Sequence, residues 1–456
     1  MSFKNMFAIG CGKLAYKLMR LVGRQASTLP GKITLTISKD ALTHVSKQRR
    51  IVCVTGTNGK TTTTSIVADI LRAKGEPMTT NHSGANLQTG LMTSMMTARH
   101  EGWTVLEVDE AALAACSDQL MPEIILVTNV FEDQTDRFGD MDHVVKLIEA
   151  GCSRTEAKLI LCADDPNLAA LGRRLNNHEV IYFGADRSLG EPVAQDDTQG
   201  VGATVNANCP VCQQALSYAA ITLGHLGFYE CSACGFSRPD PDYLFQRSPR
   251  NNGLTIMAPF KNESGSIVFP LDGLYNAYNA CAALALADRM LSGYLLIDLL
   301  GEMTNVKPQF GRLERFSWKD KEICFLLVKN PTGLEQGVRL VLEKNDVGGI
   351  LFFLNNNIAD GKSTDWIWDA NLEKHCLPDV PLGCGGDRRA DMARRLEQWL
   401  GGSRSIVLAE DDECLVMDFL NDCPAGKCIY LLPNYTAMLS LRARLAEKLG
   451  FNKHWE

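Results

Sequence analysis

Hydrophobic positions along this chain fall into two recurring patterns from about residue 48 onward. Short apolar runs, typical of buried strands, occur at 50–55, 103–108, 124–128, 158–162 and 179–183. Apolar residues with the period of a helix lie between them, for example at 61–74 and 141–151. Strands that alternate with helices predict a mostly parallel sheet whose ligands bind at the carboxyl ends of the strands.

Changes in this pattern divide the chain into three predicted parts. Residues 1–45 form an N-terminal amphipathic helix and a linker, because a Pro-Gly pair interrupts the periodicity. Residues 46–306 form an α/β domain, interrupted at about 200–246 by an inserted segment that carries cysteines and lacks long periodic runs. Residues 307–456 form a second, Rossmann-like α/β domain, with strands expected near 322–328, 348–354, 405–408 and 428–431.

The first 25 residues interleave apolar and basic side chains. The apolar positions are Phe3, Met6, Phe7, Leu14, Leu18, Leu21 and Val22, and the basic ones are Lys4, Lys13, Lys17, Arg20 and Arg24. This spacing predicts a basic amphipathic helix. Packing against the protein and contact with a membrane surface are both open, whereas the polar interruptions argue against a spanning helix.

Composition narrows the class of protein. The 456 residues include 46 basic and 53 acidic side chains, a net charge of -7, which argues against a general nucleic-acid binder. The 16 cysteines occur without a signal-peptide pattern and without an apolar run of about 18 residues. We therefore expect a protein of the reducing cytoplasm with free or metal-bound thiols.

The strongest chemical signal lies at residues 51–64, where a β-branched strand runs into a glycine turn and a helix start. Gly56 and Gly59 let the backbone fold around an anion, and the N-H groups of the turn point at it. Lys60 adds a positive charge, and the Thr61 hydroxyl can hold Mg²⁺. Position 54 is Val where the usual phosphate loop has a glycine, so this is the compressed form T-G-T-N-G-K-T.

This compressed loop resembles the ATP loop of the Mur ligase superfamily, whose members join amino acids to peptidoglycan precursors or folates through acyl phosphates. The resemblance implies a central P-loop ATPase domain in which ATP contacts Thr57, Asn58, Gly59, Lys60, Thr61 and Thr62. Glu107, at the end of an apolar strand, matches the catalytic carboxylate that binds Mg²⁺ together with Thr61. Gln134 stands where the superfamily has a metal-binding histidine, and this weaker ligand argues against a second metal.

Further elements resemble other contacts of the superfamily. Asn276 and Asn279 lie one turn apart on a helix predicted at 275–291 and match a pair that reads adenine, with helix capping as the alternative for Asn276. Arg312 matches a hinge arginine that reaches the nucleotide phosphates. Residues 81–86 resemble the loop that approaches the γ-phosphate, although an ordinary turn is a fair competitor.

Two pairs of cysteines in the inserted segment have the spacing of a zinc ribbon. Cys209 and Cys212 form one CxxC knuckle, and Cys231 and Cys234 form the other after eighteen intervening residues. Four thiolates can close around Zn²⁺ and leave no open position, so we expect a structural zinc site. Four buried free cysteines are the alternative. Because the segment between the knuckles has no Lys or Arg, a nucleic-acid-binding ribbon is disfavoured.

The C-terminal motifs narrow the resemblance to the MurT family. They comprise residues 330–333, 355–361, 366–369 and 433–439, and the zinc ribbon belongs to the same pattern. MurT proteins pair with a GatD-like class I glutaminase and amidate the D-glutamate of the lipid II stem peptide to D-isoglutamine. The resemblance implies that ATP converts the glutamate α-carboxylate to an acyl phosphate, which ammonia from the glutaminase then attacks. Such a heterodimer would work in the cytoplasm, with contact to the inner face of the membrane left open.

The resemblance also implies that an aspartate of this chain completes the partner's Cys-His triad. Asp360 is the first choice, with Asp365 and Asp369 behind it, and a surface-loop aspartate is the alternative for each. Ser363 stands where the family usually has another aspartate. The chain has no convincing glutaminase of its own, because Leu382 replaces the first glycine of an elbow around Cys384 and His454 follows too soon for a complete domain.

Two other functions are carried as alternatives. A stand-alone ligase acting on a folate or a nucleotide-linked peptide would turn over ATP with an amino acid and would need no glutaminase. A zinc-ribbon ATPase that binds nucleic acid or a protein partner would need a basic face, which the composition does not offer.

Overall fold

The computed structural model describes residues 3–22, 26–47, 49–81, 85–98, 102–131, 141–192, 208–248, 252–307, 312–357, 360 and 363–451. They fall into two compact units. The first includes the chain up to Phe131, most of the segment to Pro270, and residues 274–306. The second consists mainly of the chain from Lys307 onward, together with residues 271–273.

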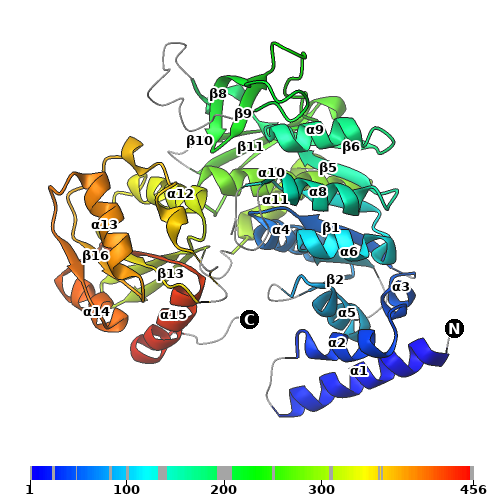
Figure 1. The fold of residues 1–456 in the computed structure, drawn as a ribbon, viewed down its shortest axis with the longest axis horizontal. Coiled ribbons are helices and arrows are strands. Elements are labelled where there is room, and N and C mark those ends of the chain that lie inside the picture. The colour runs from blue at the N-terminus through cyan, green and yellow to red at the C-terminus, as the bar shows by residue number, and fades with distance from the viewer. Residues whose placement is uncertain are drawn as a thin grey trace. The chain divides into compact units, whose positions relative to one another are not determined.

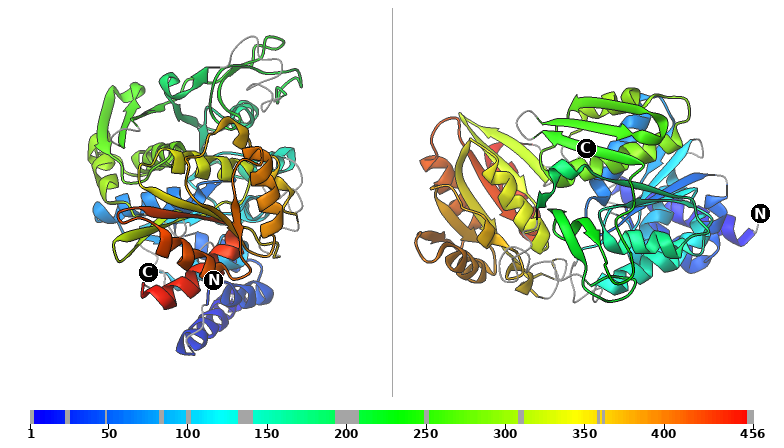
Figure 2. Two further views of the ribbon diagram at one scale, coloured as in Figure 1. Left: turned by 90° about the vertical axis from the view of Figure 1, so that its left-hand side faces the viewer. Right: turned by 90° about the horizontal axis from the view of Figure 1, so that it is seen from above.

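Within the described residues, nine strands form the main sheet of the first unit (Figures 1 and 2). Their order is β12 (Glu263–Val268), β11 (Gly253–Ala258), β10 (Tyr243–Ser248), β6 (Val180–Ala185), β5 (Lys158–Cys162), β4 (Ile124–Val127), β1 (Arg50–Thr55), β3 (Trp103–Glu107) and β2 (Met78–Thr80). The run from β10 to β2 is parallel, and β11 and β12 are antiparallel. The five strands predicted in this region are confirmed, each within two residues of its expected bounds.

Helices cover both faces of this sheet, which explains why its central strands are apolar on both sides. One face carries α4 (Lys60–Ala73), α10 (Leu274–Met290) and α11 (Leu296–Glu302), and the other carries α6 (Glu110–Leu120), α8 (Met141–Cys152) and α9 (Pro166–Arg174) (Figure 1). The carboxyl ends of β1, β3 and β4 therefore meet at one edge, where the phosphate loop and Glu107 lie.

A separate, smaller sheet follows β6 in the chain. It consists of β7 (Glu191–Pro192), β8 (Ser217–Leu223) and β9 (Leu226–Glu230), and the β8–β9 hairpin joins the two cysteine knuckles. The inserted segment begins and ends earlier than predicted, because β7 already belongs to the small sheet and β10, which begins at Tyr243, belongs to the main sheet. Tyr243 and Phe245 alternate inward and are fully buried, a period-2 pattern hidden by the neighbouring cysteine-rich sequence.

Helix α1 (Phe3–Leu21) packs on α2 (Leu29–Ile37), and α2 packs on α5 (Gln88–Thr97), while α3 (Ala41–Ser46) leads into β1 (Figure 1). A Cβ atom at Gly12 would lie 2.0 Å from the Thr34 hydroxyl, and one at Gly31 would lie 1.9 Å from the Thr89 carbonyl oxygen. These crossings need glycine, so α1 is fixed to the unit by its inner face. The predicted N-terminal helix is confirmed, and no helix in the described ranges is long and apolar enough to cross a membrane.

The second unit is a separate α/β layer structure. Its described strands form one sheet in the order β13 (Arg312–Trp318), β14 (Lys321–Leu326), β18 (Cys428–Pro433), β15 (Val347–Phe353), β16 (Leu382–Gly385) and β17 (Ile406–Leu408), parallel except for β13. One apolar core includes α12 (Pro331–Leu342) and α13 (Arg389–Leu400), and the other includes α14 (Asp412–Asp422) and α15 (Tyr435–Leu449). A two-faced parallel sheet of this kind agrees with the predicted Rossmann-like arrangement.

Candidate functional site

The phosphate loop connects the end of β1 to the start of α4 and has no space for side chains at its glycines. Gly56 and Gly59 have φ angles of +117° and +88°, which disfavour residues with a Cβ atom. A Cβ atom at Gly59 would lie 2.0 Å from the Asn279 amide oxygen, and one at Gly56 would lie 2.4 Å from the Thr128 hydroxyl. The glycines thus let the loop pass close to two neighbouring elements, and α4 begins at Lys60 with its first N-H groups facing the loop.

The segment after β4 holds this loop through a set of hydrogen bonds. The Asn129 side chain accepts from the Asn58 backbone N-H at 3.0 Å and donates to the Asn58 carbonyl at 3.1 Å. The Thr128 hydroxyl donates to the same carbonyl at 2.7 Å. The Thr57 hydroxyl accepts from the Phe131 N-H at 3.0 Å and lies 3.2 Å from the Phe131 carbonyl oxygen. The loop is therefore preorganised by its neighbour strand, as an anion cradle needs to be.

Lys60 lies among carboxylates. Its ammonium donates to the Gly56 carbonyl at 2.5 Å and pairs with the Glu110 carboxylate at 2.9 Å. Burial alone lowers the pKa of Lys60, but the charges of Glu110, Glu107 and Asp109 outweigh burial and raise the pKa above the ordinary lysine value. Lys60 therefore stays positively charged in this pocket.

The ion pair between Lys60 and Glu110 was not predicted from the sequence, because Asp109 and Glu110 are adjacent there and form one acidic cluster. Asp109 is the N-cap of α6 and accepts from the Ala111 N-H at 3.0 Å, while Glu110 is buried and faces Lys60. Burial and the charge of Glu110 raise the pKa of Asp109. The sequence distinguishes the two carboxylates in one way: an Asp just before the first residue of a helix is a favoured N-cap, which assigns capping to Asp109 and leaves Glu110 for Lys60.

Glu107 ends β3 beside β1, in register with Val54, and is buried. The Asn86 amide donates to its carboxylate at 3.0 Å, and the Asn81 side chain binds both its backbone N-H and its carbonyl at 2.8 Å. Two asparagines of the predicted 81–86 loop thus orient this carboxylate. Thr61, the other predicted Mg²⁺ ligand, is partly exposed at the start of α4, and Thr62 is buried behind it.

The predicted adenine-reading pair lies next to the loop. Asn276 and Asn279 are buried at the start of α10, and the Asn279 amide lies 3.4 Å from the Asn276 side-chain oxygen. Asn279 also packs against Gly59, so it contributes to the shape of the loop as well. Arg312 begins β13 in the second unit, and its side chain lies outside the described residues, as does the whole of Gln134.

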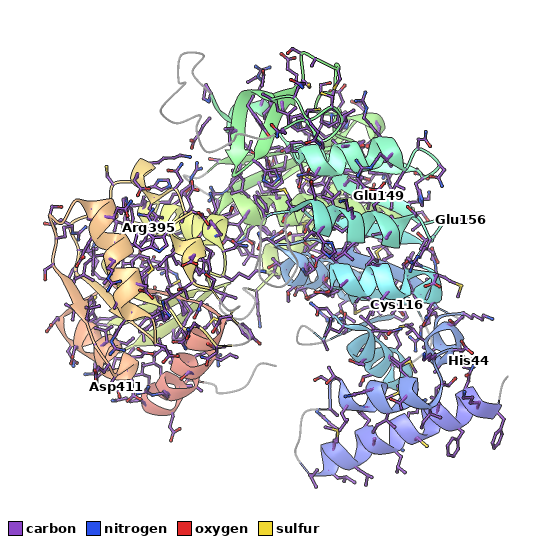
Figure 3. All side chains as sticks on the ribbon, viewed as in Figure 1. His44, Cys116, Glu149, Glu156, Arg395 and Asp411 are labelled. Atoms are coloured by element: carbon purple, nitrogen blue, oxygen red, sulfur yellow. The ribbon has the colours of Figure 1, made fainter. Side chains whose placement is uncertain are left out.

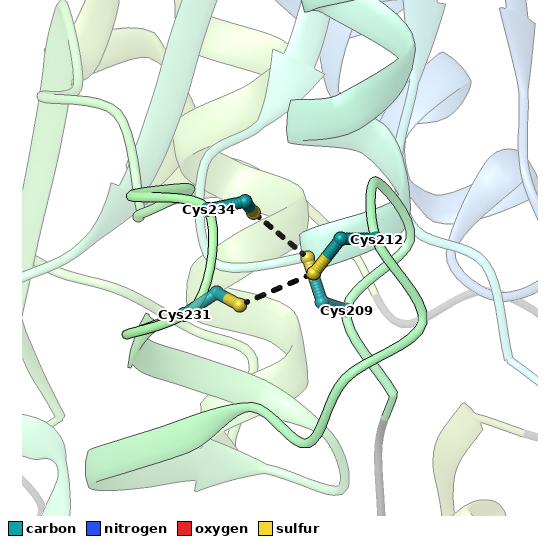
Figure 4. Close-up of side chains that lie close together, drawn as sticks. All are labelled: Cys209, Cys212, Cys231 and Cys234. Atoms are coloured by element: carbon teal, nitrogen blue, oxygen red, sulfur yellow. Dashed lines mark hydrogen bonds between the residues drawn. The ribbon is translucent and has the colours of Figure 1, made fainter.

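The four predicted zinc-ribbon cysteines converge in the first unit (Figure 4). All four sulfur atoms lie within 4.8 Å of one another, with Cys209 and Cys234 3.7 Å apart and Cys212 and Cys231 3.5 Å apart. A tetrahedron of sulfurs at about 2.3 Å from a central ion has edges of about 3.8 Å, so the cluster fits a thiolate-bound metal. Hydrogen bonding from the Cys234 and Ala233 N-H groups lowers the pKa of Cys231, whereas the pKa values of its neighbours Cys212 and Cys234 are raised.

The predicted triad aspartates differ in environment. Asp360 is buried, and its carboxylate accepts from the Thr436 N-H at 2.8 Å, from the Thr436 hydroxyl and from the Asn357 N-H at 3.2 Å. It thereby caps the start of α15, whose own N-cap side chain makes no capping bond. Asp365 and Asp369 are exposed, and Asp365 accepts from the Ser363 hydroxyl at 2.6 Å.

A buried arginine that the sequence did not single out holds the segment bearing these two aspartates. Arg395 lies on α13 (Figure 3). It is 1% exposed and donates to the carbonyls of Ile367 at 2.9 Å and Ala370 at 2.6 Å. It also forms a two-pronged ion pair with Glu373 at 2.8 and 3.0 Å. The tryptophan motif around Trp366 and Trp368 is therefore a fixed part of the second unit.

Cys384 does not have the environment of a glutaminase nucleophile. It lies inside β16, is fully buried, and its pKa is raised by burial. A nucleophilic cysteine needs a lowered pKa and access to substrate. His454 lies outside the described residues.

Comparison with known proteins agrees with these features. The family model "Mur ligase middle domain" matches residues 54–210, and "MurT ligase C-terminal" matches residues 327–438. The fold is similar to that of a pseudomurein peptide ligase type C from Methanothermus fervidus, with a TM-score of 0.66, 20% identity, and coverage of 90% of this chain and 81% of the other. It is also similar to MurF ligase from Thermotoga maritima in complex with ADP, with a TM-score of 0.61, 16% identity, and coverage of 90% and 84%.

Two curated relatives match along nearly their whole length. The chain is 35% identical to the lipid II isoglutaminyl synthase (glutamine-hydrolyzing) subunit MurT of Streptococcus pneumoniae, over 98% of this chain and 98% of the relative. It is 31% identical to the protein of the same name from Staphylococcus aureus (strain N315), over 96% and 97%. With a Mur ligase fold, an ordered phosphate loop and a MurT-type second unit, the chain belongs to the MurT family.

Proposed function

We propose that this chain is the ATP-dependent subunit of a lipid II isoglutaminyl synthase. It would convert the α-carboxylate of D-glutamate in the lipid II stem peptide to an acyl phosphate, which ammonia from a GatD-like class I glutaminase subunit then converts to the amide of D-isoglutamine. The observation that carries this proposal is the similarity to two MurT subunits along the whole chain. The buried Cys384 adds support, because the cysteine of the elbow-like segment is not accessible to glutamine, so that the ammonia would come from a partner.

The phosphate loop supports the activation half of this reaction. ATP supplies the phosphoryl group, and Mg²⁺ bound to Thr61 and Glu107 would neutralise part of its charge. Lys60 keeps its proton and can move from the Gly56 carbonyl and Glu110 to the phosphates. Asn81 and Asn86 hold Glu107 in place before the ion arrives.

The remaining predicted nucleotide contacts complete this proposal. They are Thr57, Asn58, Gly59, Thr62, Asn276, Asn279 and Arg312. The four cysteines would bind a structural Zn²⁺ with no open coordination position, because all four ligands come from the protein.

As the aspartate that completes the Cys-His triad of the glutaminase, we favour one of the two exposed residues, Asp365 and Asp369, over the buried Asp360. Asp360 already satisfies the N-terminus of α15, whereas Asp365 and Asp369 present carboxylates at the surface of the second unit. Asp360→Asn should weaken the capping of α15, and Asp365→Asn should reduce glutamine-dependent activity without unfolding that helix. Activity restored by ammonia in the Asp365 variant would identify a defect in glutamine hydrolysis.

The substrate's lipid anchor places the reaction at a membrane, and α1 supplies a surface suited to contact it. Phe3, Leu14, Leu18 and Leu21 are each more than half exposed, on the side of α1 away from Gly12. Residues 1–39 hold seven basic and no acidic side chains, although the whole chain has a net charge of -7. We therefore propose peripheral binding of α1 to an anionic bilayer.

Vesicle co-sedimentation tests this contact. The wild-type chain should bind vesicles containing phosphatidylglycerol more strongly than neutral vesicles, and binding should weaken with salt. A Leu14→Glu, Leu18→Glu variant should lose binding, whereas Leu408→Glu, at a similarly exposed leucine of the second unit, should keep it. Equal binding by all three proteins would refute the contact.

The central experiment is to purify the full chain together with a candidate class I glutaminase and to follow amidation of lipid II by mass spectrometry. Activity that requires both glutamine and ATP, and that disappears in Lys60→Ala, is expected. ATP turnover with an amino acid and no need for the glutaminase would instead indicate a stand-alone ligase.

A further inference from the structure

The hairpin between the cysteine knuckles extends from the metal-ligand cluster to the segments that hold the phosphate loop. The two knuckles lie at its base, because β8 follows Cys212 and β9 leads directly into Cys231. Its turn consists of Gly224 and His225. The hairpin contacts two different supports of the loop.

The first contact is made by the turn. The His225 ring meets the Phe131 ring edge to face, with centroids 4.8 Å apart, and a Cβ atom at Gly224 would lie 2.7 Å from the Phe131 ring. Phe131 in turn donates its backbone N-H to the Thr57 hydroxyl. One residue therefore separates the hairpin turn from the phosphate loop.

Asp165 lies beside this first contact. It is fully buried, accepts from the Val130 N-H at 2.8 Å, and lies 3.5 Å from the His225 Nε2 atom. The His225 ring and the backbone just before Phe131 thus approach the same carboxylate, although His225 Nε2 makes no hydrogen bond to it.

The second contact is made by β8. The Thr222 hydroxyl lies 2.7 Å from the Tyr278 hydroxyl, which also donates to Asp164. Arg238, just after the second knuckle, binds Asp164 at 2.7 Å. Tyr278 is the residue before Asn279 on α10, and the Asn279 side chain packs against Gly59 of the loop. The hairpin therefore supports the loop from the side of α10 as well.

We propose that the β8–β9 hairpin braces the nucleotide loop and that His225 is a positioning residue for nucleotide binding. Anchored at its base by the knuckles, the hairpin holds Phe131 against Thr57 and Tyr278 against the start of α10. This inference rests on the proposed binding of ATP to the loop. It gives the cysteine cluster an effect on the ATP site without contact between the cysteines and the nucleotide.

Titration of the chain with a fluorescent ADP analogue tests the brace. His225→Ala should raise the dissociation constant about threefold to tenfold, the range expected for loss of one edge-to-face ring pair. His225→Phe, which keeps a ring against Phe131, should restore most of the affinity. Glu230→Ala, at an exposed position near the base of the same hairpin, is the matched control and should bind as the wild type does.

Steady-state kinetics of the complex with its glutaminase separate positioning from general damage. In His225→Ala the KM for ATP should rise while kcat at saturating ATP changes little, since no reacting group is removed. A drop in kcat alone, or unchanged nucleotide affinity in a folded His225→Ala protein, would overturn the brace. Failure of the wild type to bind nucleotide would overturn the proposed function instead.

Depletion of metal with a chelator provides an independent readout. Loss of the anchor at the knuckles should weaken binding of the ADP analogue in the wild type, and should weaken it less in His225→Ala, where one of the two contacts of the hairpin is already broken. Equal weakening in both proteins would show that the cysteine cluster acts on the loop by another route and would contradict the brace.

Discussion

Replacement of Arg395 by methionine should release the segment that carries the tryptophan motif of the second unit. Methionine keeps much of the stem volume but cannot donate to the carbonyls of Ile367 and Ala370. The Ile367 carbonyl would be left without a donor, which costs about 1–3 kcal/mol, whereas the Ala370 carbonyl keeps the Leu372 N-H as a donor at 2.9 Å. The ion pair with Glu373 adds little, because that side chain is half exposed and can be hydrated.

Amide hydrogen exchange measures this loss locally, which suits a chain of two units better than a single unfolding midpoint. The amides of Ile367, Trp368 and Asp369 are hydrogen bonded within the segment and should exchange slowly in the wild type. A loss of 2 kcal/mol corresponds to exchange roughly thirtyfold faster in Arg395→Met. Peptides from the first unit should be unaffected.

Arg394→Met is the matched control. Arg394 lies next to Arg395 on α13, is largely exposed, and lies 3.8 Å from Asp391. Its replacement should change the local stability by less than about 0.5 kcal/mol. Exchange less than about threefold faster in a folded Arg395→Met protein, or equal effects in both variants, would refute the account of the segment as held by buried hydrogen bonds.

Three further outcomes follow from the site. Gly59→Ala should weaken binding of the ADP analogue at least about tenfold, because the new Cβ atom meets Asn279 and the positive φ angle is unfavourable; unchanged affinity would contradict the close packing. Glu110→Gln removes a charge that raises the pKa of Lys60, so the loss of activity at alkaline pH should move to lower pH, as a pH-rate profile can measure. Cys384→Ser should retain glutamine-dependent amidation in the complex, whereas complete loss in a folded variant would point to a catalytic thiol.

Contiguous signals in the sequence were enough to predict the loop, the cysteine cluster and most strands of both sheets. Each depends on residues close together in the chain, such as the glycines of the loop or the CxxC spacing. The role of Glu110 depends instead on how α6 is oriented against Lys60, and this orientation follows from the N-cap at Asp109 and the register of β3 beside β1. Two adjacent acidic residues in a sequence therefore do not by themselves reveal which of them will face Lys60.

Two features of the second unit were missed for a different reason. The strand β16 reads Leu-Gly-Cys-Gly, with little β propensity, and is stabilised by its position between β15 and β17. Arg395 occupies a charged position on an amphipathic helix, which usually faces water. Its burial depends on carbonyls from another segment, and carbonyls leave no pattern in a sequence.

The burial of the cysteines makes the chain selectively reactive toward thiol reagents. Most described thiols lie in the cores or in the four-cysteine cluster, whereas Cys376 and Cys414 are exposed, and both belong to the second unit. A maleimide dye added to metal-loaded protein should therefore label these two positions first. Replacing either one by serine would leave a single attachment point, and a fluorescent reporter there could follow the second unit during catalysis without changes to the nucleotide loop.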